Sequence, residues 1–159
     1  MFSQLNNIIS FIIPIAAGFA GLWGFFKGVD EYIRQGAQKR QETVTQLQKQ
    51  LNEDATLYKI CSLLEIGTPN VELKNLPFPE KRQFLVFFEY IALLTNTNLI
   101  HKDLSAYMFG YYAARCLNNE DFWHDIPKND QFWGLFLSYA KNMNTLISQK
   151  KLSFDGLHF

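Results

Sequence analysis

Few side chains in this sequence are of the types that do catalytic chemistry. The histidines are His101, His124 and His158, and the cysteines are Cys61 and Cys116. No histidine lies near a cysteine or carboxylate at metal-ligand spacing, and the P-loop, GxGxxG, GxSxG and HExxH motifs are absent. Both cysteines fall in apolar helical patterns, which is typical of small buried core residues. The sequence therefore predicts no metal site and no cofactor.

One carboxylate, that of Glu89, lies in the middle of the apolar segment LVFFEYIALL. A carboxylate on so apolar a helix needs either a partner or a raised pKa. Arg115 lies on the next predicted helix, so we expect Glu89 and Arg115 to form a buried ion pair. A functional acid at Glu89 is the alternative interpretation.

The segment from Arg115 to His124 (RCLNNEDFWH) contains the second candidate site. Eight residues separate Arg115 from His124, whereas four separate Asn119 from His124. Asn119 and His124 are therefore the two candidate catalytic residues. An asparagine that caps a short helix over Asp121–His124, together with a surface histidine, explains the same residues without catalysis.

The Asn119 and His124 spacing resembles the Arg-x4-6-His motif of nucleases with an all-helical HEPN domain. Those enzymes cleave RNA at a dimer interface. Here Asn119 occupies the arginine position, and an asparagine cannot offer a fixed cation to a phosphate. The resemblance therefore implies a degenerate, inactive HEPN-like domain, so the chain is not expected to be an enzyme.

The N-terminal stretch gives the strongest prediction in the sequence, which concerns attachment of the chain to a membrane. No charged side chain occurs from Met1 to Phe26. As a helix, Leu5 to Phe26 would be about 33 Å long, enough to cross a hydrocarbon core of about 30 Å. Membrane helices tolerate Pro14 and the glycines, and Trp23 is placed for the headgroup region. The sequence predicts a transmembrane helix over residues 1–28.

The charges that flank this stretch predict how the chain is oriented. A cleaved signal peptide would need a basic first segment, and Met1–Asn7 contains no lysine or arginine. Basic residues instead follow the stretch, at Lys27, Arg34, Lys39 and Arg40. By the positive-inside rule, the chain is a single-pass inner-membrane protein with a cytoplasmic C-terminal domain.

Small or polar residues recur along the predicted span at alternating spacings of four and three. In lipid, small residues let helix backbones approach closely, and serine or asparagine can hydrogen-bond between helices. We therefore expect self-association through this stripe. Its members are Ser3, Asn7, Ser10, Pro14, Ala17, Gly21, Gly24 and Gly28.

The rest of the chain predicts helices only. Residues 29–66 have a 3-4 apolar spacing and no proline, so we expect one stalk helix that docks onto a bundle formed by residues 67–159. A loop rich in Pro, Gly and Asn opens the bundle. Its long helices are predicted at Glu80–Leu94, Asp103–Leu117 and Asp130–Lys150. The fold class is all-α: a membrane span, a stalk and a small helical bundle.

Two families share this layout. The segments KRQETVTQLQKQL and FLVFFEYIALLTNTNLIHKDLSAYMFGYYAAR resemble a family of bacterial membrane-anchored helical proteins of unknown function, which implies no activity. The combination of one span and a degenerate HEPN-like domain also looks like the accessory membrane protein of type VI-B CRISPR systems. That resemblance implies an oligomeric membrane pore that strengthens RNA-guided antiviral defence.

Three classes of function remain. The stripe favours a membrane-embedded oligomer, a pore that acts in antiviral defence, with the lipid bilayer, further copies of the chain and a protein of a defence system as partners. A non-catalytic membrane-tethered adaptor is the alternative. A membrane-bound HEPN ribonuclease is least favoured, because its arginine is missing. The formal net charge is zero, so no direct nucleic-acid binding is expected.

Overall fold

A computed structural model describes residues 27–28, 31 and 34–149 of the chain. Every regular element in this part is helical and none is a strand, which confirms the all-α prediction there. The predicted transmembrane helix and its stripe, apart from Gly28, lie outside the described residues. Within the described ranges, none of the helices combines the length and apolar character that crossing a bilayer requires.

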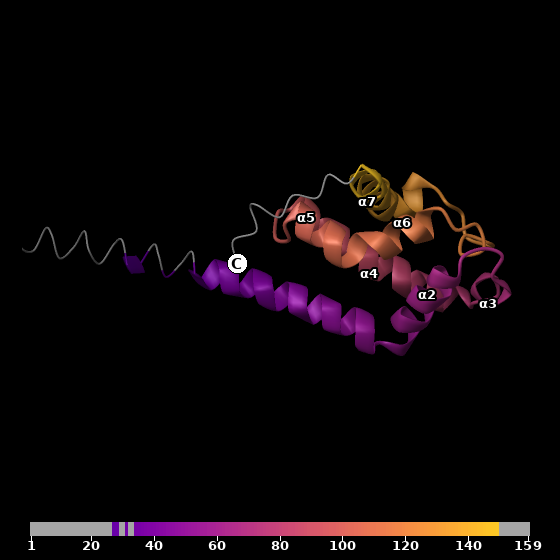
Figure 1. Ribbon diagram of the computed structural model, residues 1–159, viewed down its shortest axis with the longest axis horizontal. Helices are drawn as coiled ribbons and strands as arrows, with labels where there is room; N and C mark the ends of the chain where they lie inside the picture. The colour runs from indigo at the N-terminus through magenta and orange to yellow at the C-terminus, as the bar shows by residue number, and fades with distance from the viewer. Residues whose placement is uncertain (1–26, 29–30, 32–33, 150–159) are drawn as a thin grey trace, which may run out of the picture. The chain divides into compact units, whose positions relative to one another are not determined.

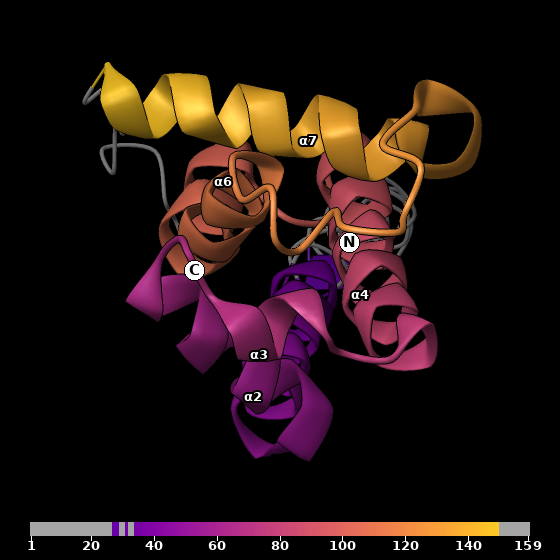
Figure 2. The ribbon, with the colours of Figure 1, turned by 90° about the vertical axis from the view of Figure 1, so that its right-hand side faces the viewer.

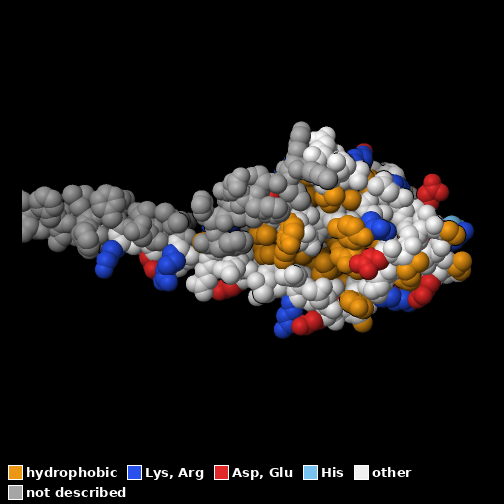
Figure 3. Space-filling view, viewed as in Figure 1, with side chains coloured by type: hydrophobic (Ala, Val, Ile, Leu, Met, Phe, Trp, Pro, Cys, Tyr) orange, Lys and Arg blue, Asp and Glu red, His pale blue; other side chains and the backbone are white. Residues whose placement is uncertain are grey.

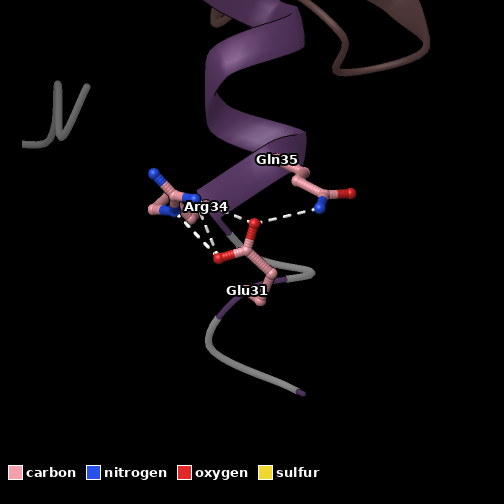
Figure 4. A network of polar contacts seen from close by, with 3 residues as sticks. All are labelled: Glu31, Arg34 and Gln35. Atoms are coloured by element: carbon pink, nitrogen blue, oxygen red, sulfur yellow. Dashed lines mark hydrogen bonds and ion pairs between the residues drawn. The ribbon is translucent and has the colours of Figure 1, made fainter. Parts of the chain in front are cut away.

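The chain divides into two compact units, which meet in sequence between Gln41 and Glu42. In the first unit, one carboxylate accepts hydrogen bonds from side chains one turn further along the helix. Glu31 accepts hydrogen bonds from Nη2 of Arg34 at 2.8 Å and from Nε2 of Gln35 at 3.0 Å (Figure 4). The bonds from Arg34 lower the pKa of Glu31, and Gln35 adds to this effect. These i,i+3 and i,i+4 contacts support a solvent-exposed helix.

The second unit begins inside the segment that the sequence predicted as a stalk. Residues 42–53 are helical, and Val44, Leu47 and Leu51 are buried in the core of this unit. The predicted continuous helix is interrupted at Asp54, whose backbone is extended (φ −72°, ψ 118°). Its Oδ1 accepts the backbone N–H groups of Thr56 and Leu57, each at 3.0 Å. Asp54 is thus the N-cap of a new helix, α2 (Ala55–Ile66).

Further helices follow α2 (Figure 1). The predicted loop contains a single helical turn, and the predicted short helix over Asp121–His124 consists of turns. The helix predicted from Asp103 to Leu117 is one helical stretch with a π-helical middle. The elements are α3 (Val71–Lys74), α4 (Phe78–Asn96), α5 (Lys102–Ser105), the π-helix η1 (Ala106–Gly110), α6 (Tyr111–Leu117) and α7 (Asp130–Ser148).

The helices of the second unit pack in layers. α7 lies across α4 and α6, and α2 contacts α4 and α6 on their other side (Figure 2). Aromatic rings pack at the contact between α4 and α7. The Phe84 and Phe88 rings of α4 are tilted with centroids 4.6 Å apart, and Phe88 meets Phe136 of α7 edge to face at 6.2 Å. α4 therefore occupies the centre of the core, as its apolar sequence predicted.

A glycine allows α6 and α7 to approach closely. Gly110 is the last residue of η1, and a Cβ atom there would lie 3.2 Å from the Cβ of Met143 and 3.4 Å from Cδ1 of Ile147. Any larger side chain would push the two helices apart. This contact positions α6 and α7 as two walls of the cleft described below.

Candidate functional site

The structure assigns ordinary structural roles to Asn119 and His124. Asn119 is buried, and its Oδ1 accepts the backbone N–H of Phe122 at 3.0 Å, as a capping residue does. The side chain of His124 is exposed, and its Nδ1 lies 2.7 Å from Oδ2 of Asp125. Within the described part of the chain, no hydrogen bond or ion pair joins Asn119 to His124. Asn119 is thus a capping residue and His124 a surface residue, but the segment that Asn119 caps forms turns and not the predicted short helix.

Arg115 contacts the end of another helix. Its Nη1 donates to the carbonyl oxygens of Leu64 at 2.9 Å and Glu65 at 3.4 Å. Both carbonyls belong to the last turn of α2, where carbonyl groups lack partners within the helix. The guanidinium carbon also lies 5.1 Å from the centre of the Tyr111 ring. Backbone and ring contacts together fix the orientation of the guanidinium.

The predicted ion pair between Glu89 and Arg115 is wrong. The half-buried Glu89 carboxylate accepts a hydrogen bond from the backbone of Phe136 in α7, and within the described residues it has no salt bridge. α7 is kinked at Trp133, whose φ of −128° and ψ of 29° are not helical. Glu89 therefore meets α7 three residues beyond this kink.

Burial also changes the protonation of Glu89. Desolvation raises its pKa above the usual value, and the hydrogen bond from Phe136 opposes this only in part. The alternative drawn from the sequence, a carboxyl with a raised pKa, thus describes Glu89 better than an ion pair does.

A cleft of about 340 Å³ opens between α6, α7 and the turn that follows α2. This volume is at the lower end of the range for small-molecule sites, about 300–1,000 Å³. Of the lining residues that the structure describes, Arg115 is the one that carries a charge. The other polar lining residues are Thr68, Tyr111, Asn118, Asn119 and Asn144. The cleft thus combines one cation with neutral hydrogen-bonding groups.

One aromatic side chain, that of Tyr111, lines this cleft, and Tyr112 lies next to it in α6. Figure 3 looks onto α6 and shows hydrophobic side chains gathered over α5 and α6. Tyr111 and Tyr112 stack edge to face, with ring centroids 5.2 Å apart. Tyr112 donates to Oε1 of Glu65 at 2.7 Å, so the nearest carboxylate of α2 is directed toward Tyr112. Burial, followed by this hydrogen bond, raises the pKa of Tyr112.

Lys81 is an important polar residue that the sequence reasoning missed. It is only 2% exposed, and its Nζ donates to the carbonyl oxygens of Lys74 at 3.0 Å, His124 at 3.3 Å and Asp121 at 3.5 Å. Burial lowers the pKa of Lys81, while nearby Asp125 and Asp121 oppose that shift. The ammonium group therefore holds the turn between α6 and α7 against α3 and α4.

A signal for Lys81 was present in the sequence. Residues 81, 84, 85 and 88 follow the i, i+3, i+4, i+7 spacing of one helix face, and the other three are apolar residues of the core. A lysine on such a face must find partners inside the protein. The spacing predicts that Lys81 is buried. It does not predict which carbonyl groups accept its hydrogen bonds, because two of the three belong to a segment about 40 positions away in the sequence.

The two cysteines and the metal-ligating side chains complete the description of the reactive groups. Cys61 and Cys116 are both buried, as predicted, and burial raises the pKa of the Cys61 thiol to about 12. Among the described residues, no cluster of His, Cys, Asp and Glu could hold a metal ion. No protein-family model matches this chain, and no curated protein or solved structure shows a significant similarity to it.

Proposed function

We propose that this chain is a membrane-tethered helical protein that self-associates through its N-terminal segment and forms a pore-like oligomer in antiviral defence. The observation that carries the proposal is the uncharged stretch from Met1 to Phe26, with its unbroken stripe of small and polar residues. The basic residues after the stretch favour a cytoplasmic helical unit. The defence role rests on the resemblance to the accessory protein of type VI-B CRISPR systems.

The physical logic of the assembly starts from the stripe. Small side chains give each helix an edge at which a second backbone can approach, and bulky apolar residues elsewhere face lipid. One helix cannot enclose water, whereas several copies in a closed ring can. Ser3, Asn7 and Ser10 would then line the opening, because polar side chains avoid lipid. A repeated head-to-tail contact gives a closed ring only with rotational symmetry.

The helical unit supports a non-catalytic role. Asn119 caps a turn and the exposed His124 lies beside Asp125, which supports this proposal. His124→Ala should therefore leave any membrane phenotype intact. Loss of that phenotype in His124→Ala would favour the ribonuclease alternative.

The decisive experiment compares two substitutions in the N-terminal segment. Gly24→Leu adds bulk within the stripe, and Ile13→Leu, outside it, preserves volume and apolarity. The wild type and Ile13→Leu should be oligomeric when purified in detergent. Both should also depolarise the membrane of cells that overexpress them. Gly24→Leu should be monomeric and inactive. A monomeric wild type would contradict the proposal.

A non-catalytic adaptor is the second candidate, and exposed aromatic residues on the helical unit favour it. Tyr58 and Tyr107 are 60% and 65% exposed, and tyrosine is enriched at protein interfaces. An adaptor would remain monomeric in detergent and would lose its partner when Tyr58 is changed to Ser. Reporter fusions after Phe159 test the tether in both cases, because they should be active only in their cytoplasmic form.

A further inference from the structure

We propose that the cleft between α2, α6 and α7 binds a phosphate monoester, with Arg115 as its anchor. The inference is independent of how the N-terminal segment assembles, because every residue that carries it lies in the second unit. It gives the helical unit a ligand of its own. The phosphate can belong to a soluble small molecule or to a lipid headgroup.

The guanidinium of Arg115 is oriented but only partly used. Nη1 is occupied by the carbonyl oxygens of Leu64 and Glu65. Within the described part of the chain, Nε and Nη2 have no hydrogen-bond acceptor, although Arg115 lines the cleft. The Tyr111 ring stacks against the group and limits its rotation. An arginine held in this way presents a rigid pair of donors, which matches the oxygen atoms of a phosphate.

Neutral donors complete the site. Thr68 and Asn144 line the same cleft from opposite walls, and their side chains have no hydrogen-bond partner among residues 34–149. Among the described residues, no aspartate or glutamate lines the cleft, and the Glu65 carboxylate accepts the hydroxyl of Tyr112 instead. The described lining therefore carries a net positive charge. Its donors outnumber the two oxygens of a carboxylate and suit the three terminal oxygens of a phosphate monoester.

A purely structural role for Arg115 is the competing explanation. Capping the carbonyl groups of α2 accounts for Nη1 alone. It assigns no role to Nε, to Nη2 or to Asn144 across the cleft. A useful test must therefore change the cleft without touching the end of α2.

Two asparagines of α7 provide a matched pair for this test. Asn144 lines the cleft, whereas Asn142 does not, and both are exposed. Phenyl phosphate is titrated calorimetrically into the full-length protein in detergent. Asn144→Leu should weaken binding by about tenfold or more, which is the effect of losing one good hydrogen bond. Asn142→Leu should bind as the wild type does.

Arg115→Lys provides the second arm. It keeps the positive charge but loses the planar pair of donors, so it should also bind at least about tenfold more weakly. Equal weakening by Asn142→Leu and Asn144→Leu, or no binding of phenyl phosphate to the wild type, would overturn the proposal. Acetate binding as tightly as phenyl phosphate would overturn the choice of phosphate.

A final comparison identifies where the phosphate comes from. The titration is repeated with the protein in phosphatidylcholine nanodiscs, with and without phosphatidic acid. If phosphatidic acid competes with phenyl phosphate, the cleft reaches a lipid headgroup. If it does not, the ligand is a soluble phosphate monoester. Both results support a phosphate site, and both require that Asn144→Leu weakens the binding observed.

Discussion

Arg115 and Glu89 are two charged side chains of apolar helical segments, and the molecule accommodates them in different places. Arg115 donates to carbonyl groups at the end of α2, beside an open cleft. Glu89 accepts a hydrogen bond from Phe136 where α7 resumes after its kink at Trp133. In both regions the partner is backbone. Ends and breaks of helices supply the groups that a second side chain was expected to supply.

The difference between the two regions lies in what remains free. The Arg115 guanidinium has donors beyond those that cap α2, and they line a cleft. Burial has the largest influence on the Glu89 carboxyl and raises its pKa. Arg115 is thus suited to bind a ligand, whereas Glu89 makes the stability of the fold depend on pH. Lys81 extends the comparison, because its ammonium group also donates to backbone carbonyl groups and its side chain is almost wholly buried.

The largest expected effect is at Lys81. Lys81→Met keeps the buried stem but leaves three carbonyl oxygens without their donor, so it should lower the free energy of unfolding by about 3 kcal/mol. The exposed ion pair between Lys59 and Glu72, 3.4 Å apart, provides the control. Lys59→Met should cost less than about 0.5 kcal/mol. Urea unfolding, followed by the fluorescence of buried Trp123 and Trp133, measures both. Equal costs would show that the carbonyl contacts of Lys81 contribute nothing.

A smaller loss is expected at Arg115. Arg115→Gln removes the donor to the last turn of α2 and the contact with Tyr111, which should cost about 1.5 kcal/mol. The end of α2 should also exchange its amide hydrogens faster. Arg82→Gln, on the exposed face of α4, is the matched control and should be nearly neutral. If Arg115→Gln is as mild as the control, Arg115 does not act as a cap.

Replacing Glu89 should change the pH dependence of the free energy of unfolding more than it changes the stability at any one pH. Its pKa is raised in the folded chain, so above pH 4.5 the folded state binds more protons than the unfolded state. Stability therefore falls as pH rises through the folded pKa and recovers as pH falls toward 4.5. Glu89→Gln keeps an acceptor for Phe136 and should flatten this dependence.

Urea midpoints at about pH 5 and about pH 8 measure the effect at Glu89. The exposed Glu53, replaced by Gln, should leave the wild-type dependence unchanged. A pH profile that is the same for Glu89→Gln and the wild type would mean that burial does not perturb this carboxyl.

The smallest expected effect is the coupling between the two regions. Because Glu89 and Arg115 contact different backbone groups, Glu89→Gln and Arg115→Gln should be additive within about 0.5 kcal/mol. The double-mutant cycle measures the remainder directly. A coupling above about 1 kcal/mol would restore the ion pair that the sequence suggested.

The positions of most helices could be predicted from the sequence because their signals are local. Asn129 caps α7, Pro79 lies in the first turn of α4, and both helices were expected close to their actual bounds. Asn119 was correctly interpreted as a capping residue. A cap, a proline and an apolar periodicity each act over one or two turns, so the chain itself contains the information.

The sequence alone did not reveal where a helix would break without a proline. The predicted stalk helix runs through Asp54, because the segment contains no proline. In the folded unit, Asp54 also accepts a hydrogen bond from Nε2 of Gln83 at 2.9 Å, across 29 positions of sequence. The cap and this distant contact together favour the break over a continuous helix.

The sequence by itself thus determined that the described chain is helical, which faces are buried and where most helices begin. Only the tertiary structure decided the partners of Arg115, Glu89 and Lys81, and the cleft beside Arg115. Local pattern shows that a charged residue is buried, because periodicity assigns it to a face. Its partner depends on which helix end or break packs against that face, and the packing of α2, α4, α6 and α7 decides this.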